Sequence, residues 1–163
     1  MPDQYGVTWN CHDERKVTLE EIQDIAITLG VVFPPSYVET ILRYNGGSPE
    51  QNVVQLKNGG DLMFSSLFSF SEDSPFYILD WYQRRLDDGI PEHLIGFGDC
   101  PFGSTYYFDY SVLTNNEPRI INIGELWEEI AEEGQTAAIG YEPIEVVDNF
   151  ESFLKSLTSL GDD

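Results

Sequence analysis

Basic residues are scarce in this chain: eight lysines and arginines stand against 29 aspartates and glutamates, which gives its 163 residues a formal net charge of −21. Binding to nucleic acid needs basic groups that displace counterions from the phosphates, so we expect no nucleic-acid partner. An anionic membrane surface is disfavoured for the same reason. A field of this sign attracts basic proteins or metal ions instead.

Cysteines and long apolar runs are scarce as well. Cys11 and Cys100 are the two cysteines, which is too few for a disulfide framework. No apolar run approaches the ~20 residues that span a bilayer. Residues 1–6 show neither the basic nor the apolar region of a secretory signal. We therefore expect a cytoplasmic protein with reduced thiols.

Known catalytic motifs are missing too. The sequence contains no G-x-S-x-G, H-E-x-x-H, Walker-loop or EF-hand spacing. Gly96-Phe97-Gly98 is similar to the start of a dinucleotide-binding loop, but Pro101 stands where the third glycine belongs. The following residues 105–110 are typical of a strand, whereas such a loop leads into a helix. We therefore expect no cofactor.

The cysteines and histidines offer two further candidates for a site. His93 with Cys100 would resemble a thiolate dyad, but a reactive thiolate needs an electropositive environment and this region is acidic. Cys11-His12 lacks the second pair of ligands that a zinc site requires. We expect neither catalysis nor metal binding from these residues.

The chain does contain enough apolar material for one folded domain. Hydrophobic residues make up 41% of it and aromatic residues 13%, and a chain of this length buries about 68–70% of its unfolded surface. Residues 1–16 lack periodicity and are predicted to be an N-terminal arm that lies on the surface or frays from it. Residues 17–163 are predicted to be a single domain.

Helical spacing and capping signals predict helices near both ends of the chain. Thr18 and Glu21 have the capping-box spacing, Gly30 is a helix stop, and Asp148 is a candidate N-cap. With their caps, the predicted helices cover residues 18–30, 34–44, 74–89 and 148–161, and a short acidic helix covers 125–133. Strands are predicted at 53–56, 62–70, 94–98, 105–110, 119–123 and 144–147. This order predicts an α+β domain with a central, mostly antiparallel sheet flanked by N- and C-terminal helices.

Asn45-Gly46-Gly47, at the end of the second predicted helix, has two interpretations. These residues tolerate the left-handed conformation of a helix C-cap. The same loop could present its backbone amides to an anionic ligand. The C-cap is the favoured interpretation.

The negative charge is concentrated in the second half of the chain. Residues 86–163 hold 17 acidic residues and two basic ones, Arg119 and Lys155, for a net charge of −15. Acids near the C-terminus of a helix oppose its macrodipole, which suggests a use for the pair at the end of the third helix. The predicted partner-binding residues are Asp87, Asp88, Glu125, Trp127, Glu128, Glu129, Glu132 and Glu133. The alternative is a solvated helix face with Trp127 packed in the core.

Three segments, in chain order, resemble the SUKH superfamily. Its N-terminal signature is similar to Leu29-Gly30-Val31, Phe33-Pro34, Tyr37, Ile41-Leu42 and Tyr44-Asn45-Gly46-Gly47. Its central sheet segment is similar to Ile95-Gly96-Phe97-Gly98-Asp99, Gly103 and Phe108-Asp109-Tyr110. The run from Val147 to Leu154 resembles its final helix. The resemblance covers roughly residues 17–160, with departures in a longer middle segment (57–92) and an acidic insertion (124–143).

The resemblance implies a cytosolic, non-catalytic protein. We separately expect a monomer or weak dimer without a cofactor. Bacterial members resemble immunity proteins that neutralise polymorphic or contact-dependent toxins, often nucleases or deaminases, by binding them. A toxin that acts on nucleic acid carries a basic substrate groove, and an acidic protein presents a field of the same sign as that substrate. We therefore expect a basic toxin domain as partner and occlusion of its active site as mechanism.

Two other functions stay open. Fungal members of the family act as regulators of cell-wall assembly, so a non-catalytic regulatory scaffold is the alternative. An acid-dependent hydrolase is the third hypothesis, with Asp99 and Asp109 as its paired carboxyl groups. That chemistry needs the two carboxyl groups roughly 5–10 Å apart, with the pKa of one of them raised.

Overall fold

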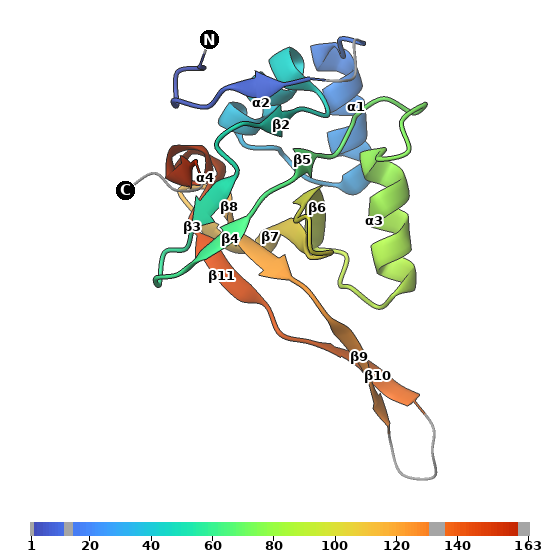
Figure 1. Ribbon diagram of the computed structural model, residues 1–163. Helices are drawn as coiled ribbons and strands as arrows, with labels where there is room; N and C mark the ends of the chain where they lie inside the picture. The colour runs from blue at the N-terminus through green and yellow to red at the C-terminus, as the bar shows by residue number, and fades with distance from the viewer. Residues whose placement is uncertain (1, 12–14, 131–135, 160–163) are drawn as a thin grey trace.

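The computed structural model describes residues 2–11, 15–130 and 136–159, and Figure 1 shows their arrangement. Its centre is an antiparallel sheet of five strands in the order β11-β8-β7-β6-β5. The strands are β5 (Ser66–Leu67), β6 (Leu94–Asp99), β7 (Thr105–Thr114), β8 (Glu117–Ile123) and β11 (Ile144–Val147). The helices are α1 (Leu19–Leu29), α2 (Pro35–Tyr44), α3 (Ile78–Asp87) and α4 (Phe150–Ser156). The predicted α+β class is confirmed.

Three smaller sheets surround the central one. A strand pair joins β1 (Trp9–Asn10) to β2 (Ser48–Pro49). A second sheet has the order β12-β3-β4 and consists of β3 (Val53–Gln55), β4 (Asp61–Met63) and β12 (Leu157–Thr158). The third is a hairpin of β9 (Leu126–Ile130) and β10 (Thr136–Tyr141). Pairing between distant segments, such as β12 with β3, is set by the tertiary fold and left no signal in the local sequence.

Local signals place the first two helices as predicted. At the start of α1 the Thr18 hydroxyl accepts from the Glu21 amide at 3.1 Å, while the Glu21 carboxylate accepts from the Thr18 amide at 3.1 Å. Gly30 ends the helix in the left-handed conformation, with φ at 72°. α2 begins at Pro35, where a missing N–H group costs nothing.

The later helices are shorter than predicted. α3 begins at Ile78, four residues after the predicted cap Ser74. The intervening residues form turns, and Tyr77 bridges to Ser69, so the helix cannot begin earlier. α4 is capped by Asn149, whose side chain accepts from the Ser152 amide at 2.8 Å. Asp148, the predicted cap, instead accepts from Lys57 at 2.8 Å. The helix then ends at Ser156, because the following residues join β3.

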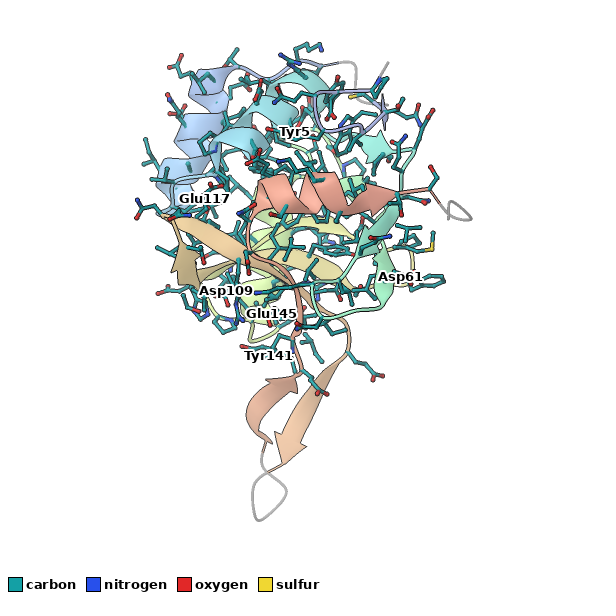
Figure 2. All side chains as sticks on the ribbon, turned by 90° about the vertical axis from the view of Figure 1, so that its left-hand side faces the viewer. Tyr5, Asp61, Asp109, Glu117, Tyr141 and Glu145 are labelled. Atoms are coloured by element: carbon teal, nitrogen blue, oxygen red, sulfur yellow. The ribbon has the colours of Figure 1, made fainter. Side chains whose placement is uncertain are left out.

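The two faces of the central sheet bury different sets of side chains. Alternation along the strands sends Phe97, Phe108 and Ile120 to one face and Leu94, Tyr107 and Ile121 to the other. On the first face, an aromatic core forms under α4, which lies across the sheet in Figure 2. Its largest fully buried members include Tyr37, Phe64, Phe97, Phe108, Phe150 and Phe153.

The N-terminal residues need a correction, because they do not all lie on the surface. Val7 is fully buried and Trp9 is 9% exposed, and both belong to the aromatic core. The Asp3 carboxylate accepts from the amides of Tyr5 and Val7 and from the Trp9 indole, which fixes this segment locally. A domain boundary between residues 16 and 17 stays a prediction.

The predicted strand at 62–70 is also broken. β4 ends at Met63 and β5 covers only Ser66 and Leu67. Phe64, Phe68 and Phe70 are buried, but Leu67 and Ser69 between them are buried as well, so burial does not alternate along this stretch. None of the described helices is long and apolar enough to cross a membrane.

Candidate protein-binding surface

Residues 125–133 were predicted to be a helix, and this prediction is wrong. Residues 126–130 form β9, which pairs antiparallel with β10 so that Leu126 lies opposite Tyr141 and Trp127 opposite Gly140. Figure 1 shows this hairpin extending away from the central sheet. Apolar and acidic residues in this stretch fit a helical period, but pairing with residues 136–141 decides the conformation. Glu132 and Glu133 lie outside the described residues.

The root of the hairpin is packed on the second face of the sheet. Leu126 and Tyr141, which pair across the two strands, contact a small apolar cluster. The cluster consists of Ile90, Leu94, Tyr107, Ile121 and Ile123. The hairpin therefore leaves the domain from a fixed position.

The end of α3 reaches this same face, because Ile90, two residues after Asp88, belongs to the apolar cluster. Burial raises the pKa of the Tyr107 hydroxyl to about 12, the charge of Arg85 lowers it, and Asp88 and Tyr141 raise it further. Arg85 also pairs with Asp88 at 3.3 Å, so this end of α3 carries a cation beside its acids. The end of α3 and the start of the hairpin therefore meet at one apolar cluster. Asp87 and Asp88 shortly precede Ile90 in the chain, and Glu125 directly precedes Leu126.

The placement of Asp87 and Asp88 has a local explanation that the sequence analysis missed. Arg85 pairs with Asp88 at 3.3 Å, and the Gln83 amide donates to Asp87 at 3.1 Å. Arg84 and Arg85 also supply positive charge to the last turn of α3, where the macrodipole favours it. Asp87 and Asp88 thus lie at the end of α3 as predicted, and their local partners offset the unfavourable interaction with the macrodipole. Their role in binding stays a prediction.

Both basic residues of the acidic half are already engaged. Arg119 donates to Asp109 at 2.9 Å, and Lys155 pairs with Glu151 at 3.3 Å. Neither side chain is therefore available to neutralise the acids of the hairpin. The negative field of residues 86–163 is left to act on a partner.

The two carboxyl groups of the hydrolase hypothesis lie at opposite ends of their strands. Asp99 is opposite Thr105, whereas Asp109 is opposite Leu94. Five residues of strand separate these positions, or about 15 Å at the usual rise per residue. This spacing exceeds what a pair of catalytic acids requires, so the pairing of Asp99 with Asp109 is wrong.

The two acids also have different environments. Burial raises the pKa of Asp99, and hydrogen bonds from Ser66 offset this only in part. Burial acts on Asp109 in the same direction, but hydrogen bonds from Ser111 and Arg119 outweigh it and lower its pKa. Asp109 is thus held as a carboxylate by its partners, which is a structural role.

His93 and Cys100 do not form a dyad. They flank opposite ends of β6, and Cys100 is buried in the aromatic core at 5% exposure. His93 instead lies 3.7 Å from Asp109. The exposed Cys11 donates its thiol to the Asn45 carbonyl, and His12 lies outside the described residues. Among the residues that the structure describes, no group of three or more His, Cys, Asp or Glu is placed to hold a metal ion.

Asn45 does more than end a helix. The Asn45 residue is 3% exposed. Its side-chain oxygen accepts from the Phe70 backbone amide at 2.7 Å, and its side-chain NH₂ group donates to the hydroxyls of Ser69 and Ser71 at 3.2 and 3.1 Å. The side chain thus ties α2 to the segment before α3. These hydrogen bonds explain why Asn45 is buried, with no need for a bound ligand. No local sequence pattern predicts them, because the partner residues lie 24 to 26 positions away.

The Asp109 network predicts how stability depends on pH. Because the pKa of Asp109 is lower in the folded chain than in the unfolded one, its contribution is present above about pH 4 and is lost as the pH falls through the folded value. Asp109→Asn should lower the free energy of unfolding at pH 7 by about 2 kcal/mol. It should also flatten the loss of stability below pH 4, which urea titrations across that range would measure.

The matched control is Asp61→Asn, which changes an exposed strand residue of the same type. We expect the stability of this variant to stay within about 0.5 kcal/mol of the parent chain. Equal effects of the two substitutions would contradict a stabilising role for the Asp109 network.

Comparison with known proteins agrees with this architecture. The family model described as the SMI1/KNR4 family (SUKH-1) matches residues 16–156. That match begins just before α1 and ends with α4, so it includes the central sheet and the hairpin. A search of the curated proteins finds no significant match. The chain belongs to the SMI1/KNR4 family of the SUKH superfamily.

Proposed function

We propose that the chain is an immunity protein that binds a basic toxin domain and blocks its active site. The observation that carries this proposal is the acidic hairpin, which extends from the domain (Figure 1) and is rooted on the apolar cluster that also contains Ile90, just after α3. Glu125, Glu128 and Glu129 belong to its first strand or directly precede it. A projecting acidic element is suited to enter a basic groove.

Two further features support a binding role. A two-stranded hairpin has outer backbone edges that pair with no other described strand, and an added strand of a partner can use such an edge. The net charge of −21 steers a basic partner toward the chain before contact. In this proposal Trp127, in β9, is an aromatic anchor, since tryptophan is enriched at binding hot spots.

Affinity capture of the tagged chain from its native host at low salt tests the proposal. We expect recovery of a secreted protein with a basic C-terminal domain. Production of that domain alone should arrest growth of a bacterial test strain, and co-production of this chain should restore it. If the captured domain arrests growth equally with and without this chain, the immunity function is wrong.

The alternative is a regulatory scaffold that acts on a cellular protein. Recovery of cellular regulatory proteins only, at low salt and with a toxin-producing culture, would favour it. The salt dependence of the complex supplies a second test of the steering argument. Association should slow steeply between about 50 and 500 mM salt, because screening shortens the range of the acidic field.

A further inference from the structure

An apolar groove runs beside α1, away from the hairpin. It has a volume of about 370 Å³, and α1 forms one wall with Leu19, Ala26 and Ile27. Val31, Val32 and Val38 line the other side. Among the described residues that line it, Gln23 alone has a polar side chain, so a partner in this groove meets almost only carbon atoms.

The residues that border this groove are unusually exposed for aliphatic side chains. Leu19 is 48% exposed, Ile27 77% and Val32 84%. Leu19 and Ile27 are eight residues apart, which places them on one side of a helix, next to the stripe that α1 buries with Ile22 and Ile25. Single exposed aliphatic residues need no explanation, but three that border one groove mark an interaction site.

The border of the groove is acidic. Glu20 and Asp24 are exposed on α1, and at 100° per residue they lie next to Ile27 on the outer side of the apolar stripe. The helix itself contains no lysine or arginine. The groove therefore combines an apolar floor with carboxylates along one edge.

A third carboxylate lies near the other wall. The Tyr110 hydroxyl donates to the Val32 carbonyl at 2.9 Å. Burial raises the pKa of Tyr110, and the nearby charge of Glu117 raises it further. Glu117 is accordingly close to the Val32 side of the groove, and Figure 2 shows it near the end of α1.

The two cations that precede α1 bind other groups. Arg15 pairs with Glu21 at the start of α1, and Lys16 donates to the Arg43 carbonyl in the last turn of α2 at 3.1 Å. None of the ion pairs between described residues includes Glu20, Asp24 or Glu117, so these carboxylates are left for a partner.

We propose that this groove binds an amphipathic helix of a partner protein, one that carries lysines or arginines beside its apolar stripe. An apolar groove takes the spaced apolar side chains of such a helix, and the carboxylates at its border pair with the basic flank. A second copy of this chain fits poorly, because two chains with a net charge of −21 each repel one another. Figure 1 shows α1 and the hairpin at opposite ends of the molecule, so this site is separate from the proposed toxin-binding hairpin.

The probe for the test is a synthetic helical peptide of about five turns, with leucines on one face and lysines on the other. Its binding is followed by fluorescence anisotropy and by amide NMR shifts of the full chain. We expect shifts in α1 and in residues 31–38. The double variant Ile27→Asp/Val32→Asp should weaken binding by about tenfold or more.

Two controls make this result specific. Phe102→Asp changes another strongly exposed apolar residue, 83% exposed, and should leave peptide binding unchanged. A peptide with glutamates in place of its lysines should not bind. A variant with the hairpin glutamates changed to glutamine should bind the lysine peptide as the parent does, which separates this site from the proposed function.

Three results would overturn the inference. The first is peptide-induced shifts confined to the hairpin. The second is equal binding by the Ile27→Asp/Val32→Asp variant, provided that thermal melts show it folded. The third is a stable dimer of the parent chain, seen by sedimentation and abolished by the same double variant, which would assign the groove to a second copy.

Discussion

Neutralising the hairpin should slow association with the captured basic partner by about tenfold or more at low salt. The variant changes Glu125, Glu128, Glu129, Glu132 and Glu133 to glutamine. The reason is that Glu125, Glu128 and Glu129 directly precede or belong to the first strand of a hairpin that extends from the domain, while Arg119 and Lys155 are already paired within the domain. Stopped-flow measurement of the association rate constant, at several salt concentrations, checks the result.

A variant with the same net charge separates local steering from a general loss of charge. It neutralises five exposed acids elsewhere on the chain, namely Glu50, Asp61, Glu72, Asp73 and Glu92. We expect a decrease of about threefold or less, because these charges lie outside the hairpin. Equal slowing by both variants would show that the net charge steers the partner and that the hairpin makes no larger contribution to the association rate than other acidic residues.

Gly98→Ala should be the most destabilising of the small substitutions considered, at about 3 kcal/mol. A Cβ atom at this position would lie 2.5 Å from the Phe64 ring and 2.8 Å from the Ser66 carbonyl oxygen. That ring has no free space, because Tyr106 and Phe153 pack against it with centroids 5.3 and 5.2 Å away. The melting temperature should fall by about 10 °C.

Gly124→Ala is the matched control for this substitution. The nearest atom to its added methyl group would be the Ser104 Cβ atom at 3.7 Å, an ordinary contact. We expect a change within about 0.5 kcal/mol. Equal melting temperatures for the two alanine variants would contradict the steric account of Gly98.

The same contact explains why Gly96-Phe97-Gly98 is similar to a nucleotide-binding loop without being one. The register of β6 against β7 shifts between Gly96 and Gly98. Phe97 points into the aromatic core, and its ring stacks on Phe108 with centroids 4.5 Å apart. The glycines leave room for neighbouring rings, and the sequence alone shows only the spacing.

The first helix shows what local sequence can determine. Thr18, Glu21 and Gly30 act within the first and last turns of α1, so their hydrogen bonds need no other part of the chain. The strands β6, β7, β8 and β11 were likewise predictable, because each is a short apolar run bounded by turn-forming residues. The family resemblance followed from these same segments, and the family match confirmed it.

The hairpin and the α1 groove show what local sequence leaves open. Leu126 to Ile130 has a composition that suits a helix, and only the partner strand from Thr136 to Tyr141 makes it extended. Ile27 and Val32 read as ordinary apolar residues, and their exposure follows from how α1 packs against the rest of the fold. Both surfaces depend on contacts between distant segments.

By itself the sequence determined the acidic character, the α+β class, the family and the elements whose signals lie within a few residues of one another. Only the tertiary structure decided that the acidic insertion is a rooted hairpin, that Asp99 and Asp109 are far apart, and that Asn45 joins two segments. The physical reason is the range of the interactions. Caps and alternation act between near neighbours, whereas strand pairing, buried hydrogen bonds and surface grooves join residues that only folding brings together.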